Sequence, residues 1–569
     1  MAGALGNAGA EPSGEIERLG ILRPLGPSLL ARMGRRLRNG LRQWVYTTPL
    51  HELRLKGRHP LRLLGSPDDP WPGDREAGEE LMNGSLSHGG VTLSLDGAGF
   101  WSDCLNEPRL CDHVLGFVWL RDLACVADQR RARMTAESLM RGFLAHHARY
   151  HPLVWRADLL ARRLMLSLLH APLILSNQDL VYRSAVLNAL ARQARHLMRA
   201  AGDVETGTAS VEAASGLILA GLLLPHGAAA RERGETLLRR SLDRMLLPDG
   251  GVLSRSVGDM VHIMQQLITV RDAMTERGEE PPEMLQHRLD RMAPTLRMLL
   301  HHDGRMAHIA GGERVPHELI ERVLAASDAR GKAPDLARAT GLARLSARRS
   351  LLILDAMPPP PDGLDRGAHA GCLAFEFSDR DRRLVVNIGH GSGELASLCR
   401  TTAAHSTLVL DDRNQTEIMG EGLGEGVNEI RIERRLAEAG RRISASHDGY
   451  RRRFSLLHRR TLALSPEGDL LEGEDRLEPA GRPARTVPEA VLRFHLHPDV
   501  TVSMTEGGHA ILLRLDNRHG WLFRAGDFRP EIEESLYVED GTPRRSSLIL
   551  VRAGVGPTGL AIPWRFERL

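Results

Sequence analysis

The spacing of apolar residues divides the chain into two long parts with different periods. From about residue 101 to residue 345, apolar residues recur at intervals of three and four, as in LVWRADLLARRLMLSLLHAPLIL between Leu153 and Leu175. This spacing predicts amphipathic helices. Turn signals such as Pro248-Asp249-Gly250 separate them, so we expect antiparallel helical hairpins. Such a series forms a bundle, a solenoid or a closed α/α toroid. No motif recurs at a fixed period, which disfavours the solenoid.

From about residue 346 to residue 569 the period changes to two. Short runs such as CLAFEFS, RLVVNIG and STLVLDD alternate apolar and polar positions between Gly, Asp, Pro and Asn. Many short strands at close spacing predict an antiparallel β-sandwich. Residues 1–100 read as an irregular and partly helical segment with one small hairpin in LMNGSLSHGGVTLSLDG. We therefore predict an α+β multidomain chain divided into 1–100, 101–345 and 346–569.

Composition limits the classes of function. The chain has 569 residues, which is too many for one core, and its 75 basic and 72 acidic residues give a net charge of +3. This balance provides no general argument for nucleic-acid binding. Most basic residues are Arg, whose planar fork matches carboxylate and sulfate, so an Arg-lined cleft for an acidic ligand is one expectation. The alternative is that the coding sequence simply favours Arg.

Targeting signals and cysteines add further expectations. The N-terminal residues show no basic stretch followed by an apolar one, and no apolar run is long enough to span a membrane. We expect a cytoplasmic protein, or a periplasmic one if the start site is misassigned. The segment Leu29 to Val45 predicts a basic amphipathic helix that either contacts anionic lipid or, as is commoner, packs on its own domain. Five cysteines without a CxxC pair predict buried free thiols.

The segment from Gly367 to Gln415 carries the strongest candidate chemistry. His369 and His405 each stand at the edge of a predicted strand, and a third strand ends in Asn387. Imidazole at such edges can act as an acid, a base or a metal ligand near neutral pH.

The order of several segments resembles a known family. HAGCLAFEFS, RLVVNIG, RTTAAHSTLVLDDRNQ and SHDGYRRRF, with HRRTLALS and GEDRL, resemble the C-terminal β domain of the heparinase II/III-like polysaccharide lyases. GFVWLRDL and the Trp155-Arg156 segment resemble the helical part of bacterial members. The resemblance extends from about residue 45 to the end. It implies an (α/α) toroid followed by an antiparallel β-sandwich, with a groove for an acidic polysaccharide or oligosaccharide that contains uronic acid.

Such enzymes cleave their glycans by β-elimination. The uronate carboxylate must be neutralised, a base must remove the proton beside it, and an acid must protonate the leaving oxygen. The resemblance implies Asn-His and Tyr side chains from the toroid and a His from the β domain. In some members it also implies a metal, held between His and Asp side chains.

The β-domain positions are only partly retained. His369 and His405 match family histidines and are the candidate ligands of a structural divalent metal such as zinc. However, Gly371 and Asn387 stand where the family often has Asp, and Gly367 stands where it often has His. Zinc rarely uses an amide. The alternative is that the two histidines are hydrogen-bonded inside the sandwich.

The toroid positions depart further. Thr208-Ala209 stands where Asn-His is expected, and Asp259 and His262 stand in the segment where a Tyr is expected. Arg255 could neutralise a carboxylate, because guanidinium pairs with it bidentately. Two sets of candidates result. The candidate catalytic residues are His405, Tyr450, His369 and Arg255. The candidate substrate-binding residues are His262, Asp259, Arg400 and His447.

Two functions remain open at this point. The first is a polysaccharide lyase with a rearranged site. The second is a catalytically degenerate protein of the same fold that binds glycan or serves as a scaffold in envelope assembly. The missing Asn-His and Tyr favour the second, and the retained histidines favour the first. From the sequence we predict the lyase and keep the scaffold as the alternative.

Overall fold

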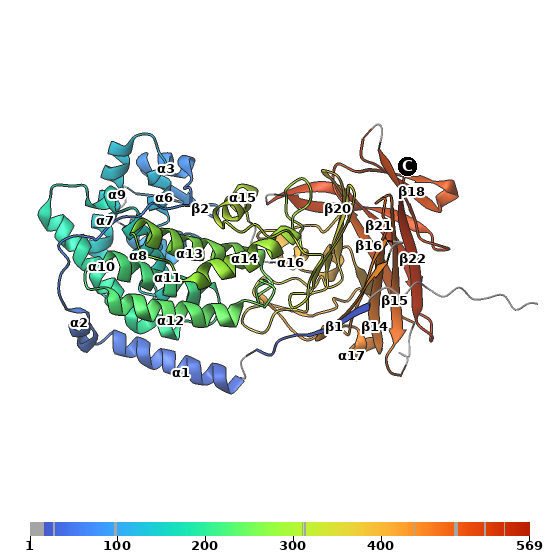
Figure 1. Ribbon diagram of the computed structural model, residues 1–569, viewed down its shortest axis with the longest axis horizontal. Coiled ribbons are helices and arrows are strands. Elements are labelled where there is room, and N and C mark those ends of the chain that lie inside the picture. Colours follow the sequence, from blue (N-terminus) through green and yellow to red (C-terminus); the bar gives the residue numbers. More distant parts are fainter. Residues whose placement is uncertain are drawn as a thin grey trace, which may run out of the picture. The chain divides into compact units, whose positions relative to one another are not determined.

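The computed structural model divides the chain into two compact units. It describes residues 16–26, 29–95, 99–309, 311, 315–437, 440–482, 487–516, 519–539 and 541–569. The helical unit comprises residues 27–245 and 262–289, and the β unit comprises residues 1–26, 246–261 and 290–569 (Figure 1). Two of the four boundaries between the units fall inside the long helices α13 (Val257–Glu276) and α14 (Glu283–Met298).

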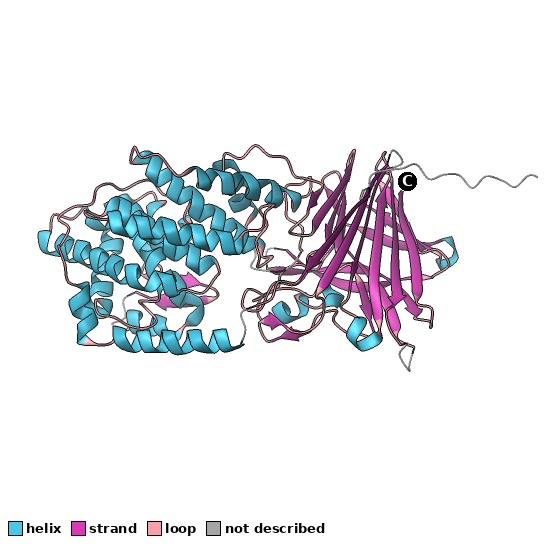
Figure 2. Cartoon of the chain, turned by 60° about the horizontal axis from the view of Figure 1, so that its bottom comes forward, coloured by secondary structure: helices cyan, strands magenta, loops and turns pink. Residues whose placement is uncertain are grey.

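The helical unit is built from packed helices, as the three- and four-residue spacing predicts (Figure 2). Its remaining helices are α1 (Leu29–Tyr46), α2 (Pro49–Leu55), α3 (Arg75–Met82), α4 (Phe100–Asn106), α5 (Pro108–Leu115), α6 (Trp119–Ala124), α7 (Gln129–His147), α8 (Ala157–Leu169), α9 (Ala171–Leu175), α10 (Leu180–Ala200), the 3-10 turn η1 (Ala201–Asp203), α11 (Thr208–Leu223) and α12 (Ala228–Met245). The predicted small hairpin is β2 (Ser85–His88) paired with β3 (Val91–Ser94).

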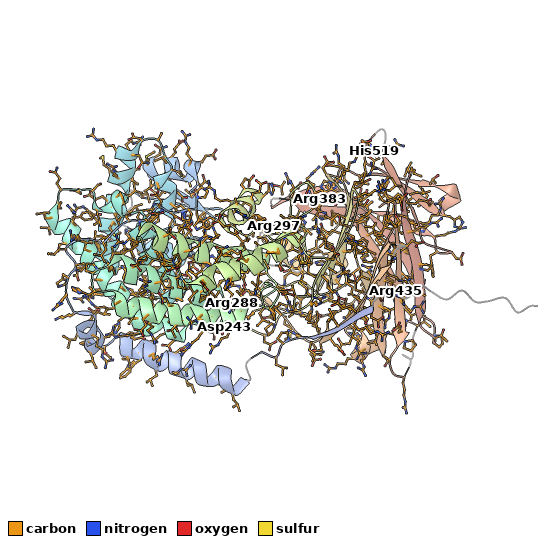
Figure 3. The ribbon with its side chains drawn as sticks, viewed as in Figure 1. Asp243, Arg288, Arg297, Arg383, Arg435 and His519 are labelled. Carbon is orange, nitrogen blue, oxygen red and sulfur yellow. The ribbon has the colours of Figure 1, made fainter. Side chains whose placement is uncertain are left out.

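Helix α11 lies at the centre of this unit. It is apolar on all sides and almost entirely buried, which is the pattern of a core helix rather than a surface one. A Cβ at Gly216 would lie 2.7 Å from the Cβ of Ala161, so glycine here permits the close approach of α8. The one acidic side chain of α11, Glu212, accepts a bidentate pair of hydrogen bonds from Arg162 at 2.6 and 2.9 Å. Peripheral helices are joined by surface ion pairs such as Arg288–Asp243, both labelled in Figure 3.

The β unit contains two large antiparallel sheets. One has the order β1-β12-β13-β14-β15-β22-β19-β18-β17, and the other has the order β20-β21-β16-β8-β7-β6-β5-β4, with β9 paired to β16. The first sheet contains β1 (Ile16–Leu22), β12 (Glu429–Ala437), β13 (Gly440–His447), β14 (Leu456–Leu464), β15 (Leu470–Pro479), β17 (Thr501–Thr505), β18 (Ala510–Arg514), β19 (Gly520–Arg524) and β22 (Leu560–Arg568).

The second sheet contains β4 (Leu336–Ala337), β5 (Leu342–Ala347), β6 (Ser350–Asp355), β7 (Phe375–Asp379), β8 (Arg382–Val386), β9 (Leu408–Leu410), β16 (Glu489–Leu496), β20 (Pro530–Glu539) and β21 (Thr542–Gly554). The unit also contains α15 (His317–Ala326), α16 (Glu394–Cys399), α17 (Arg451–Phe454), the 3-10 turns η2 (Thr402–Ala404) and η3 (Glu506–Gly508), and the short pair β10 (Ile418–Met419) and β11 (Gly422–Leu423).

Side chains from both large sheets form one core. In β14, buried and partly exposed positions alternate along the whole strand, which is the period-two pattern of a half-buried sheet. Phe375 of one sheet stacks on Trp564 of the other at 5.5 Å between ring centroids, and Phe494 meets Phe523 at 5.1 Å. Aromatic contacts of this kind join the two layers of the sandwich.

Strand β1 was not predicted from the sequence. It pairs antiparallel with β12 at the edge of the first sheet, with Leu19 opposite Ile432. It extends the sheet with residues that lie more than 400 positions earlier in the chain.

The predictions about buried cysteine thiols and about membrane spans can be checked on the described residues. All five cysteines are free and four are buried, but Cys125 is exposed, so the expectation of buried thiols was wrong there. Cys125 follows α6 directly, at the point where that helix ends at the surface. Within the described part of the chain, the helices include none that is both long and apolar enough to cross a bilayer.

Candidate functional site in the β unit

His369 and His405 are brought together, as the sequence predicts. His369 lies in the loop between β6 and β7, and His405 follows η2. Their Nδ1 and Nε2 atoms are 3.1 Å apart. The Nδ1 of His405 lies 2.7 Å from the Thr401 carbonyl, which can only accept a hydrogen bond. His405 is therefore protonated on Nδ1, and its Nε2 accepts the hydrogen bond from His369.

Both imidazoles are neutral at neutral pH. Burial lowers the pKa of His405 to about 4, and burial together with the neighbouring histidines lowers the pKa of His369 well below its usual value. A Cβ at Gly371 would lie only 2.5 Å from the His405 ring. The absence of a side chain at position 371 therefore makes room for this ring.

A buried carboxylate beneath this pair was missed by the sequence analysis. Glu376 of β7 is fully buried and accepts four hydrogen bonds: from the His301 ring at 3.0 Å, from the backbone N–H of His308 at 2.9 Å, and from the backbone and side-chain amides of Asn387 at 3.1 and 3.2 Å. Burial alone would raise the pKa of Glu376, but the hydrogen bond from His301 and nearby positive charge outweigh it and hold the pKa at about 2.

The environment of Glu376 explains why position 387 is an amide. The Asn387 side chain donates to Glu376 and accepts from the backbone N–H of Ser406 at 2.8 Å. A carboxylate at position 387 could not donate, and it would place a second negative charge against Glu376. Asn387 therefore links strand β7 to the segment that follows η2.

These residues do not fit a zinc ion. Both ring nitrogens of His405 and both polar atoms of the Asn387 side chain are used in hydrogen bonds. Among the described residues, no group of three or more His, Cys, Asp or Glu side chains is arranged to hold a metal. Zinc requires three or four such ligands. The arrangement corresponds to the alternative reading, in which the histidines are hydrogen-bonded inside the sandwich.

Tyr450 and His447 belong to a different network. Tyr450 is buried and its hydroxyl donates to the Leu408 carbonyl at 2.9 Å, while burial raises its pKa well above the usual value. His447 accepts from the Gly449 N–H at 3.1 Å and contacts His458 at 3.2 Å, and His458 in turn donates to Asp475 at 2.7 Å.

Arg255 and Arg400 each bind backbone carbonyls of the β unit. Arg255 is buried and donates to the Thr340 carbonyl at 2.8 Å, and burial lowers its pKa to about 10. Arg400 donates to the carbonyls of Ala368, Gly420 and Gly422 at 2.7–3.0 Å. Both guanidinium groups thus fasten loops.

Asp259 and His262 lie near the start of α13 and are half-buried. The backbone N–H of Asp259 donates to the Ser256 hydroxyl at 3.2 Å, which caps this end of the helix.

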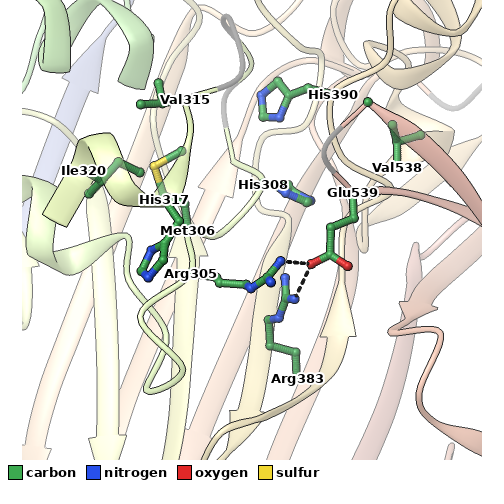
Figure 4. A pocket seen from close by; sticks show the side chains of 11 residues that line it. Arg305, Met306, His308, Val315, His317, Ile320, Arg383, His390, Val538 and Glu539 are labelled. Atoms are coloured by element: carbon green, nitrogen blue, oxygen red, sulfur yellow. Dashed lines mark hydrogen bonds and ion pairs between the residues drawn. The ribbon is translucent and has the colours of Figure 1, made fainter. Parts of the chain in front are cut away.

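An open pocket lies next to the histidine pair. It is lined by Arg305, Met306, His308, Val315, His317, Ile320, Arg383, His390, Val538, Glu539 and Gly541 (Figure 4). The ring of His390 is 5.2 Å from that of His369 and 5.5 Å from that of His308, between centroids. A continuous series of ring contacts therefore leads from this pocket, which we call the His390 pocket, to His405.

Charges at the His390 pocket are compensated within the chain. Glu539 accepts from both Arg305 and Arg383, as the dashed lines in Figure 4 show, at 2.5 and 3.0 Å. Arg383 also pairs with Asp303 at 3.1 Å. His308, His390 and Glu539 were not predicted from the sequence. The nearest signal was the strand end at Asn387, three residues before His390.

The chain is similar to known proteins both in sequence and in fold. Residues 329–564 match the family model described as heparinase II/III-like, C-terminal. Over 555 residues the chain is 29% identical to FtsZ-localized protein C of Caulobacter vibrioides (strain NA1000 / CB15N), covering 93% of this chain and 94% of that protein.

Two solved structures share the whole architecture. Heparinase III matches with a TM-score of 0.69 at 12% identity, covering 96% of this chain and 92% of that chain. The heparan sulfate lyase HepC from Pedobacter heparinus matches with a TM-score of 0.62 at 14% identity, covering 89% and 86%. The predicted fold class, an α/α toroid followed by an antiparallel β-sandwich, is confirmed. Residues 329–564 are therefore a heparinase II/III-like C-terminal domain, and the chain as a whole has the fold of heparinase III.

Proposed function

We propose that this chain is a catalytically degenerate member of the family that works as a scaffold in envelope assembly at the division site. One observation carries the proposal: the residues at the family's chemical positions have become structural. His405 and Asn387 use all their polar side-chain atoms within the chain, and the Tyr450 hydroxyl is buried on a backbone carbonyl. A general base must reach the proton that it abstracts, and none of these groups reaches solvent.

The division-site part of the proposal rests on the relative. FtsZ-localized protein C is similar over nearly the full length of both chains, including the helical unit. A shared role would use the folded surface of the protein and would not need a reaction.

Two measurements test this function. The unsaturated uronate that β-elimination creates absorbs in the ultraviolet, so purified protein should give no rise in absorbance with a panel of uronate glycans that heparinase III cleaves in parallel. A fluorescent fusion should gather at the division site together with FtsZ, and its compartment tests the predicted cytoplasmic location. Turnover of any glycan in the panel, or a uniform distribution of the fusion in dividing cells, would contradict the proposal.

A lyase acting on an acidic glycan is the second candidate. The observation in its favour is the series of rings from the His390 pocket to His405, together with the arginines that line the pocket. If a rise in absorbance is found, His405→Ala and His390→Ala should abolish it. A rise that survives His405→Ala would show that the candidate catalytic residues are wrongly assigned.

A further inference from the structure

Helix α1 presents its apolar side outward. Leu30, Met33, Leu37, Leu41 and Trp44 fall on one stripe at helical spacing. In a helix that packs on its own domain, this stripe would be buried. Here the five side chains are between 52% and 80% exposed. The segment is the amphipathic helix that the sequence predicts, but its apolar side is not the one that contacts the helical unit.

The other side of α1 holds the helix against the helical unit. Arg42 forms an ion pair with Asp203. The Tyr46 ring contacts those of His51, Tyr150 and His196 at 4.7–5.6 Å between centroids. In Figure 1, α1 accordingly lies along the edge of the helical unit. The helix is therefore attached through its polar side and its C-terminal end, while its apolar stripe has no cover among the described residues.

The charged residues of α1 are all basic. The 18 residues of α1 include five arginines and no acidic residue. The arginines are Arg32, Arg35, Arg36, Arg38 and Arg42. At 100° per residue, these positions fall on the flanks and on the face opposite the stripe. The charged residues beside the apolar stripe are all cations. Such a helix is complementary to a surface that has an apolar interior and anionic groups at its boundary.

We propose that α1 binds the surface of an anionic lipid bilayer and lies in the plane of its headgroups. The leucine stripe would enter the acyl boundary, Trp44 would lie at headgroup level, and Arg38 on the flank of the stripe would meet lipid phosphates. The helix would not span the bilayer, because the arginines interrupt its apolar sequence. A second copy of α1 is a poorer occupant of the stripe, because it would bring five further cations against the first five.

The proposal goes beyond the scaffold function and stands on a different element, so the two can fail separately. Leu50 and Leu53 of α2, the next helix in the chain, are also exposed apolar residues, at 53% and 57%. Arg54 adds a basic residue in the last turn of α2. The two helices together present exposed apolar side chains and basic residues over residues 29–55.

Vesicle flotation with the full-length protein tests the proposal. The protein should float with vesicles of phosphatidylcholine and phosphatidylglycerol, should bind pure phosphatidylcholine about tenfold more weakly, and should be released by high salt. The double substitution Leu37→Gln and Leu41→Gln should weaken binding at least about tenfold, because it removes the centre of the stripe. The matched control is Leu180→Gln with Val181→Gln, which changes two exposed apolar residues at the start of α10 and should leave binding unchanged.

Trp44 offers a second measurement that needs no destabilising variant. It is 65% exposed, whereas the other six tryptophans are buried. Those six are Trp71, Trp101, Trp119, Trp155, Trp521 and Trp564. Anionic vesicles should shift the emission of the wild-type protein to the blue and protect it from acrylamide, and Trp44→Phe should remove both effects.

Several outcomes would overturn the proposal. These are no flotation with anionic vesicles at low salt, equal loss of binding in the α10 control, and unchanged Trp44 quenching on vesicles. A dimer in light scattering that Leu37→Gln with Leu41→Gln converts to a monomer would assign the stripe to a second copy of the chain instead.

Discussion

At the scale of single residues, the candidate chemical residues of the β unit make structural hydrogen bonds within the chain. The sequence resemblance implies metal ligands at the positions of His405, Asn387 and Gly371. In this chain His405 is hydrogen-bonded to His369, Asn387 is hydrogen-bonded to Glu376 and to the backbone N–H of Ser406, and Gly371 leaves room for the His405 ring. A buried carboxylate of this kind stabilises the fold only while every donor is present.

Glu376→Gln should destabilise the protein by about 3 kcal/mol at neutral pH. The pKa of Glu376 is about 2 in the folded state and near 4.5 when the chain is unfolded. A lowered carboxyl pKa contributes stability that is fully present above the unfolded value and is lost as the pH falls toward the folded value. The difference in unfolding free energy between wild type and variant should therefore be constant above pH 4.5 and shrink below it. Urea titrations across this range measure the difference, and a gap that does not change with pH would contradict the assignment.

Gly371→Ala should destabilise the β unit by about 1–3 kcal/mol, because its Cβ would collide with the His405 ring. In a His405→Ala background the obstacle is absent, so the same substitution should cost much less. A double-mutant cycle measured by thermal unfolding isolates this coupling. Additive effects would show that the two positions do not compete for space.

At the scale of elements, the alternation of buried positions explains which strands could be predicted. In β14 and β22 the pattern of apolar residues follows the pattern of burial, so these strands are visible in the sequence. The meeting of His369 and His405 could also be predicted, because both stand at strand edges in one segment.

Other features depend on contacts between distant segments, which the local sequence pattern does not indicate. Glu376 alternates with Phe375 and Phe377, and the sequence therefore suggests a solvent-facing position, but loops from elsewhere in the β unit cover that face and supply its donors. The exposed stripe of α1 has the periodicity of an ordinary surface helix, and only the structure shows which side of the helix is attached.

Strand β1 stabilises the edge of the first sheet. Leu19→Asp should destabilise the protein by about 1–3 kcal/mol, because Leu19 packs against the core of the sandwich and faces Ile432 across the ladder. Arg18→Gln is the matched control: Arg18 is exposed and its pair with Glu433 lies at the surface, so its loss should cost less than about 0.5 kcal/mol. Chemical denaturation compares the two, and equal effects would mean that β1 adds little to the sheet.

At the scale of the whole molecule, burial of many neutral histidines makes stability depend on pH. Burial lowers the pKa of His405 to about 4 and that of His495 to about 3, from an ordinary value near 6.5. Between these values the unfolded chain binds protons that the folded chain does not, so stability should fall as the pH drops from 6.5 toward 4. Midpoints of urea unfolding should decline steadily over this window.

Two variants test the contribution of single buried histidines. His405→Gln and His495→Gln should each flatten the decline of the urea midpoint with pH, because each removes a buried imidazole whose pKa is lowered in the folded state. A midpoint that stays constant from pH 7 to pH 5 in the wild-type protein would contradict neutral burial of these rings.

The pairing of β1 with β12 also fixes an order of events during synthesis. Leu22 pairs with Glu429, so 407 residues must be made after β1 leaves the ribosome before its partner exists. At about 5–20 residues per second, this delay is roughly 20–80 s. During that interval an apolar strand at the N-terminal end of the nascent chain has no ladder to join. We therefore expect chaperones that hold nascent chains to engage β1 until β12 has been synthesised.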